Sequence, residues 1–61
     1  MELTCIEKVI DSNGKIKDIV LQTKTGETAT VTPEQLRSSL VRKEHFVTNI
    51  KLDKSNNLVY E

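Results

Sequence analysis

The sequence predicts a small α+β domain in which an antiparallel sheet carries a single helix. Three observations lead to this class. Runs rich in β-branched residues alternate with turn-forming clusters, one central segment has a complete helix-start signal, and the chain has only 61 residues. This length predicts one domain over residues 1–61 with one small core.

The first predicted hairpin joins strands at residues 3–10 and 16–22 through the polar cluster of residues 11–15. Two turns fit. A two-residue turn would set Lys8 against Ile19, whereas a type I turn with Gly14 in the left-handed conformation matches side chains across the strands. We therefore predict the second turn. Its cross-strand pairs are Asp11 with Lys15, Ile10 with Ile16, Lys8 with Asp18 and Ile6 with Val20.

The second predicted hairpin repeats this turn at residues 23–27, with Gly26 in the left-handed position. It pairs Leu21 with Ala29 and Ile19 with Val31, so that the first three strands form a meander. Both faces of the meander are partly apolar, and such a sheet must curl or be covered on both sides. One face carries Ile6, Ile10, Ile16 and Val20, and the other carries Leu3, Cys5, Ile19, Leu21, Ala29 and Val31.

A helix is predicted to start at Pro33. Thr32 is a good N-cap, Gln35 completes a capping box, and proline suits the first helical position. We expect the helix to end near Arg42. Leu36 and Leu40 should be buried with Val41 beside them, leaving Glu34, Arg37 and Ser38 in solvent.

Residues 46–52 alternate with period two and predict a fourth strand, with Phe46, Thr48, Ile50 and Leu52 on its core face. A third turn, with Asn56 in the left-handed position, sets Leu52 against Leu58 and Ile50 against Tyr60. Residues 58–60 then form a fifth strand. The expected fold is a curled antiparallel five-stranded sheet, with the helix across one face or capping a partly open, SH3-like barrel.

Four of these signatures together resemble a family of short, uncharacterised single-domain proteins of Gram-positive bacteria and their phages, plasmids and conjugative elements. They are Asn13-Gly14, Thr25-Gly26, Val31-Thr32 with Leu36, and the run from Val47 to Leu52. The last turn departs from the family pattern, because Ser55-Asn56 replaces an acidic residue and glycine. The resemblance implies a mobile-element or host-interaction context and assigns no activity.

Composition argues against several functional classes. Nine basic and nine acidic residues give a formal charge of zero, so no overall field attracts nucleic acid or an anionic membrane. No apolar run approaches the roughly 18 residues of a membrane span, and the first residues lack the features of a signal peptide. The single cysteine, Cys5, lies in an apolar run that suits a reducing compartment. We expect a soluble, unprocessed cytoplasmic protein.

The sequence predicts no catalytic, cofactor or metal site. His45 is the only histidine and Cys5 the only cysteine, so neither has a partner for nucleophilic or metal chemistry. Asp11 and Asp53 stand at turn starts, where aspartate is favoured for local hydrogen bonds. We therefore predict a protein that is not an enzyme.

The remaining polar residues define candidate contacts with a partner. A modest basic surface could form along the helix end and the second hairpin, from Arg37, Arg42, Lys43, Lys51 and Lys54. Nucleic-acid modules, however, usually add stacking aromatics. Asn49 is unusual within a strand; it either bonds a helix end or a bulged backbone group, or it contacts a partner. The candidate residues are Arg37, Arg42, Lys43, His45, Asn49, Lys51 and Tyr60.

The predicted function is a non-catalytic binding module that acts through protein–protein contacts, as an accessory or inhibitory factor of a mobile element. Its protein partner is unknown, and pairing of an edge strand could also give a homodimer. The alternative is a small nucleic-acid-binding protein that uses the helix end and the second hairpin.

Overall fold

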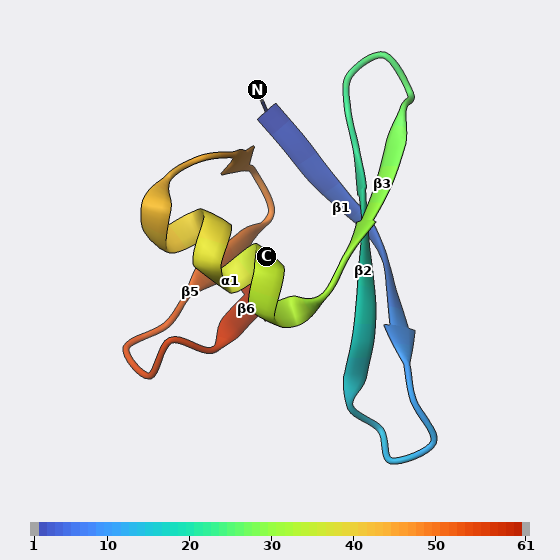
Figure 1. Ribbon diagram of the computed structural model, residues 1–61, viewed down its shortest axis with the longest axis vertical. Coiled ribbons are helices and arrows are strands. Elements are labelled where there is room, and N and C mark those ends of the chain that lie inside the picture. The colour runs from blue at the N-terminus through green and yellow to red at the C-terminus, as the bar shows by residue number, and fades with distance from the viewer. Residues whose placement is uncertain (1, 61) are drawn as a thin grey trace.

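The computed structural model describes residues 2–60, so residues 1 and 61 of the predicted domain lie outside it (Figure 1). It is an α+β fold, as predicted, but the strands form two sheets instead of one. A four-stranded sheet has the order β3-β2-β1-β4, and β5 pairs only with β6. No barrel closes within residues 2–60. The elements are β1 (Glu2–Ile10), β2 (Ile16–Gln22), β3 (Thr28–Val31), α1 (Pro33–Arg42), β4 (Phe46–Val47), β5 (Ile50–Leu52) and β6 (Leu58–Tyr60).

The three hairpin turns have one geometry, which confirms the predicted left-handed positions. In the first turn, Asp11 N–H donates to the Lys15 carbonyl at 2.8 Å, and Gly14 N–H donates to the Asp11 carbonyl at 3.1 Å. The turns at Thr23 and Asp53 repeat both bonds. The left-handed residues are Gly14 (φ 79°), Gly26 (φ 93°) and Asn56 (φ 62°).

The strand registers of β2–β3 and β5–β6 are also as predicted, with Leu21 opposite Ala29 and Leu52 opposite Leu58. The β1–β2 register is wrong in its middle. Ile10 does face Ile16, but Lys8 lies opposite Ile19 and Glu7 lies opposite Val20. The cause is a pair of offsetting bulges, one adding Lys17 to β2 and the other adding Ile6 to β1.

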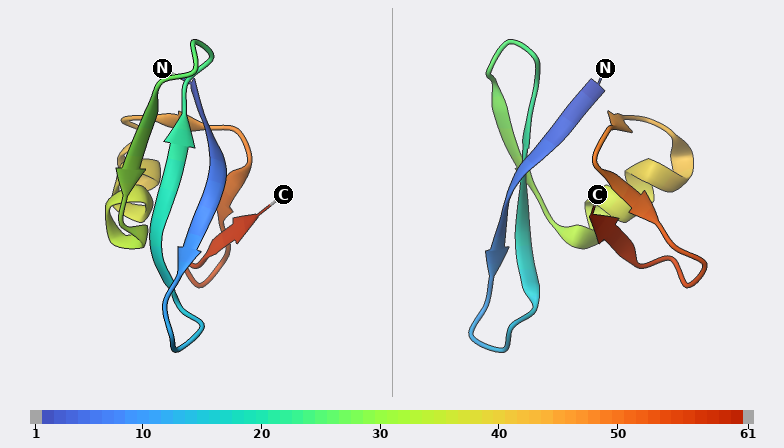
Figure 2. Two further views of the ribbon diagram at one scale, coloured as in Figure 1. Left: turned by 90° about the vertical axis from the view of Figure 1, so that its right-hand side faces the viewer. Right: turned by 180° about the vertical axis from the view of Figure 1, so that it is seen from behind.

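Bulges strengthen the twist of a sheet, and here the sheet curls instead of being covered on both sides. The helix and the β5–β6 hairpin both lie on one side of it, and the other side is open (Figure 2). Among the apolar side chains left in solvent, Ile6 is 49% exposed and Ile10 is 51% exposed.

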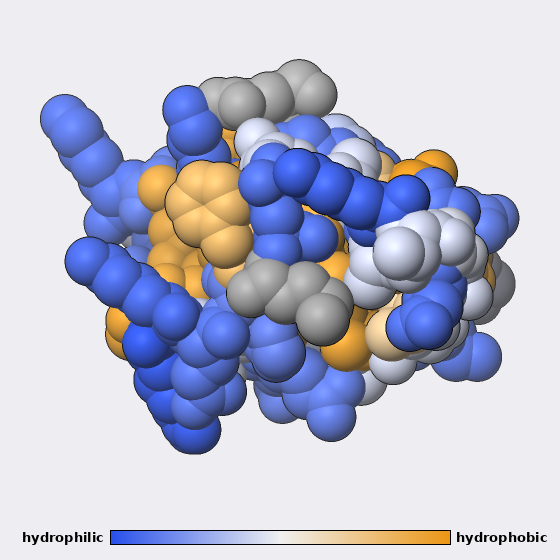
Figure 3. Space-filling model, turned by 90° about the horizontal axis from the view of Figure 1, so that it is seen from above, coloured by the Kyte–Doolittle hydropathy of each residue, from blue (hydrophilic) through white to orange (hydrophobic). Residues whose placement is uncertain are grey.

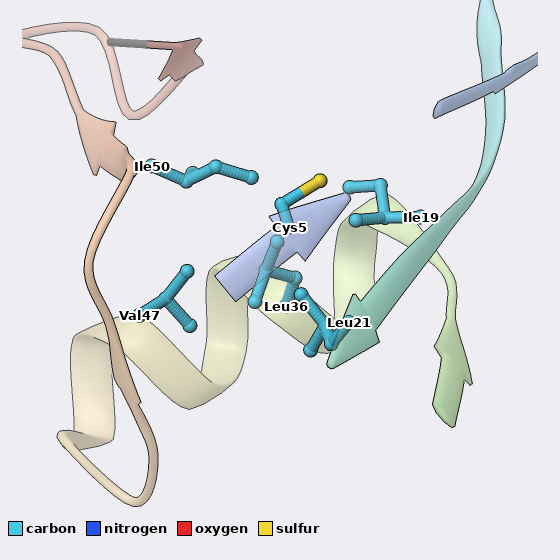
Figure 4. Packing of buried hydrophobic residues seen from close by; sticks show 6 residues of the cluster. All are labelled: Cys5, Ile19, Leu21, Leu36, Val47 and Ile50. Atoms are coloured by element: carbon cyan, nitrogen blue, oxygen red, sulfur yellow. The ribbon is translucent and has the colours of Figure 1, made fainter. Parts of the chain in front are cut away.

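The core lies between the curled sheet and the elements on its covered side (Figure 4). Leu36 from the helix and Ile19 from β2 are its most completely buried large side chains. The six buried residues are Cys5, Ile19, Leu21, Leu36, Val47 and Ile50. Partly buried side chains surround them: Leu3, Ile16, Val31, Leu40 and Leu58.

The helix begins and ends as predicted. Gln35 N–H donates to Thr32 Oγ1 at 3.2 Å and Thr32 N–H donates to Gln35 Oε1 at 3.0 Å, which confirms the capping box. Its last turn lies at the end farther from β2 and β3 (Figure 1), and Val41 is 63% exposed and not buried as expected. Arg37 and Ser38 are half-buried instead of lying in solvent.

The predicted fourth strand is broken into β4 and β5 by Thr48 and Asn49, and the prediction that Phe46 lies in the core is therefore wrong. Val47 and Ile50, three positions apart, are both buried, whereas Phe46 is 65% exposed. β4 runs parallel to β1, with Glu2 opposite Phe46, so the four-stranded sheet is mixed and not antiparallel throughout. Within the described chain, no helix has the length and apolarity needed to cross a membrane.

Candidate functional site

A hollow of about 360 Å³ lies between the end of α1 and β4. Leu40 and Val47 give it apolar walls that continue into the core. Figure 3, which looks down on the end of the molecule that carries β4, shows apolar surface exposed between hydrophilic side chains. The lining residues are Leu40, Lys43, His45, Phe46 and Val47.

The local backbone explains this arrangement. Lys43 adopts a left-handed conformation (φ 59°) and donates its N–H to the Leu40 carbonyl at 3.3 Å, which ends the helix and turns the chain. The chain then returns to β1, where parallel pairing fixes β4. Since successive strand side chains point to opposite faces, burying Val47 turns Phe46 outward.

The charge around the hollow is modestly positive. Arg42 and Glu44 form an exposed ion pair at 3.4 Å and offset each other. Lys43 and His45 line the hollow itself. The hollow combines apolar walls, an exposed aromatic ring and a cation. It is therefore suited to bind a ligand in which an apolar group lies next to an anionic one.

Asn49 has a structural role. Its Oδ1 accepts the Cys5 N–H at 2.9 Å, and its Nδ2 donates to the Cys5 carbonyl at 2.8 Å. The amide thus replaces a strand partner directly beside the bulge in β1. Nearby, Thr48 N–H donates to the Leu3 carbonyl at 3.1 Å. These bonds explain why the strand breaks here, and they match the bulged-backbone alternative stated above.

A second cluster joins β6 to β1. The Cys5 thiol and the Tyr60 hydroxyl are hydrogen-bonded, and the Lys8 ammonium lies 4.2 Å from the centre of the Tyr60 ring. Burial, the hydrogen bond to Cys5 and the electrostatic interaction with Cys5 raise the pKa of Tyr60 to about 12. The phenol is therefore neutral near pH 7 and serves to hold the strands together. No group of three or more potential metal ligands occurs among residues 2–60.

The structure brings together two of the predicted contact residues, Lys43 and His45. Arg42 is adjacent to them but forms an ion pair with Glu44. Asn49 and Tyr60 are both hydrogen-bonded to Cys5. Arg37 is a half-buried helix residue, and its Nε is buried without a hydrogen-bond partner in the described structure. Lys51 lies on β5 and does not line the hollow.

Sequence reasoning missed Phe46, Leu40 and Val47 as parts of a site. One signal could have found them. Asn49 is disfavoured inside a strand. A strand break at Asn49 would have allowed Val47, instead of Phe46, to point into the core.

A smaller hollow of about 250 Å³ is lined by Glu2 and by residues of the β2–β3 turn, namely Thr23, Lys24, Thr25 and Glu27. Its lining residues are all polar or charged, whereas leucine, valine and phenylalanine line the first hollow.

Comparison with protein-family models, curated proteins and solved structures found no match to this chain.

Proposed function

We propose that this protein is a non-catalytic interaction module that binds a segment of another protein in the hollow between α1 and β4. The observation that carries the proposal is the 65% exposure of Phe46 beside apolar walls. Aromatic residues, phenylalanine included, are enriched in protein interfaces relative to the rest of the protein surface. The proposed partner is a protein of the host or of a mobile element, following the resemblance described above.

The chemistry of the hollow favours a particular kind of segment. Leu40 and Val47 can bury an apolar side chain against the Phe46 ring, and Lys43 can pair with a neighbouring carboxylate. A non-catalytic role agrees with the placement of the reactive groups. Cys5 is buried and bonded to Tyr60, whereas His45 lies at the hollow.

Selection from a library of random displayed peptides tests the proposal. The wild-type protein should enrich peptides that join an apolar residue to an acidic one, and Phe46→Ala should lose them. The matched control is Ile10→Ala, since Ile10 is also exposed (51%) but lies beside the first turn. Failure to enrich any peptide, or enrichment that survives Phe46→Ala, would contradict the proposal.

Lys43→Gly gives a second, independent variant. Glycine adopts the left-handed conformation of residue 43 more readily than lysine does, so this change should stabilise the helix end. It also removes the cation from the hollow. We expect a higher melting temperature together with weaker binding of the acidic peptides, which a variant that merely unfolds could not show.

A second candidate function is binding of single-stranded nucleic acid, and one observation favours it. The Phe46 ring, which the sequence analysis placed in the core, is exposed beside Lys43 and His45. It could stack on a base of a single strand. Fluorescence anisotropy with labelled oligo-dT and oligo-U tests it. Binding that weakens steeply between about 50 mM and 200 mM salt, and that is lost when both Arg42 and Lys43 are replaced by alanine, would favour this function over peptide binding.

A further inference from the structure

β3 is an open edge of the four-stranded sheet. It stands first in the order β3-β2-β1-β4, and no described element pairs with its outer side. Figure 2 (left) shows it at the margin of the sheet, with the helix behind it. At the opposite edge, β4 pairs only with Glu2 and Leu3, so the rest of β1 also lies at that edge. Residues 6–10 of β1, however, include a bulge and charged side chains, which β3 does not have.

The hydrogen bonds of the adjacent turn fix which groups of β3 face outward. Thr23 N–H donates to the Glu27 carbonyl at 2.9 Å, which makes residues 23 and 27 a hydrogen-bonded pair. Because such pairs alternate in an antiparallel ladder, Ala29 and Val31 bond to β2. Thr28 and Thr30 must then direct their N–H and C=O groups away from the sheet.

The row of backbone N–H and C=O groups that point away from β2 ends at the start of the helix. The next outward residue, Thr32, uses its N–H on Gln35 Oε1 at 3.0 Å and its carbonyl on the Leu36 N–H at 3.0 Å. The edge therefore offers a defined set of two donors and two acceptors, all from Thr28 and Thr30.

β3 is short, with four residues, but it lacks the other sequence features that usually protect an edge strand. Residues 28–31 contain no charge, proline or bulge, whereas β1 and β2 each carry charged residues of both signs. Threonine and valine favour strand pairing, and alanine leaves space for a neighbouring chain.

We propose that β3 pairs antiparallel with β3 of a second copy of this chain, joining two four-stranded sheets into one. A two-fold axis at Ala29 sets Thr28 of each copy opposite Thr30 of the other. All outward donors and acceptors are then used, in four hydrogen bonds. The pairing is self-complementary, because an uncharged strand meets its own copy and threonine meets threonine. The hollow beside β4 lies at the other edge of the sheet, so this surface is independent of the proposed function.

Sedimentation equilibrium over a wide range of protein concentrations tests the pairing. The wild-type mass should rise from 6.9 kDa towards twice that value. Thr30→Pro should weaken association about tenfold or more, because it removes two of the four hydrogen bonds. An outward-facing edge position tolerates proline. Thr30→Val, which keeps the backbone donor, is the matched control and should associate much more strongly than Thr30→Pro.

Amide hydrogen exchange, measured by NMR, tests the register in the wild-type protein without any variant. The Thr28 and Thr30 amides should be protected at high protein concentration and exchange rapidly on dilution. The Ala29 and Val31 amides, bonded to β2, should be protected at both concentrations. A protein that stays monomeric at millimolar concentration, or a dimer whose Thr28 and Thr30 amides exchange rapidly, would overturn the proposal.

Discussion

Asn49 shows how a single side chain can set the path of the backbone. Its amide occupies both the N–H and the carbonyl of Cys5, at 2.9 and 2.8 Å. Asn49→Ala would leave both groups without partners in a half-buried position, and we expect it to lower the free energy of unfolding by about 2–3 kcal/mol. Urea denaturation measures this loss. Asn13→Ala is the control, since Asn13 is exposed in the first turn and its loss should have little effect. Equal stability of the two variants would refute the role given to Asn49.

Tyr60 predicts how stability depends on pH. The fold raises its pKa from 10.0 to about 12, so the folded protein holds the phenolic proton more tightly than the unfolded chain. The stabilisation from this group is present in full below pH 10 and is lost as the pH rises towards 12. Because the chain has one tyrosine and no tryptophan, tyrosinate absorbance reports this group alone. The stability of Tyr60→Phe should therefore fall less between pH 10 and pH 12 than that of the wild type. If stability depends on pH in the same way in both proteins, the prediction is wrong.

The break between β4 and β5 makes the neighbouring residues Phe46 and Val47 contribute differently to the free energy of unfolding. Phe46→Ala should change the free energy of unfolding by about 0.5 kcal/mol or less, because the ring is 65% exposed. Val47→Ala should cost about 2 kcal/mol, because Val47 is 7% exposed within the core. Denaturation of both variants checks the order. A continuous strand with Phe46 inside would give the opposite result.

The sequence predicts those elements that local chemistry determines. Gly14, Gly26 and Asn56 define their turns, each turn sets the register next to it, and Thr32 with Gln35 starts the helix. The missed features depend on contacts between distant segments. The bulges in β1 and β2, the parallel β1–β4 pair and the Asn49 bonds to Cys5 involve choices that strict alternation cannot reveal. The hollow was missed for the same reason, since its lining depends on which way Phe46 points.

The whole molecule has one covered side and one open side, and this limits its stability. All of its core packing lies between the curled sheet and the helix with the β5–β6 hairpin (Figures 1 and 2). The six buried residues include no aromatic side chain. A domain of this size rarely exceeds roughly 3–5 kcal/mol of stability from its core. Binding at the hollow or pairing through β3 would add to this by mass action.

So small a core predicts that one truncation can unfold the protein. Leu36 is 1% exposed, and Leu36→Ala should cost about 2–5 kcal/mol, which is comparable to the entire stability expected. We expect largely unfolded protein at 25 °C, seen as collapsed amide dispersion in NMR spectra. Val41→Ala, in the same helix but 63% exposed, is the control and should stay folded. If Leu36→Ala instead remained fully folded, the core would have more reserve than its six buried side chains imply.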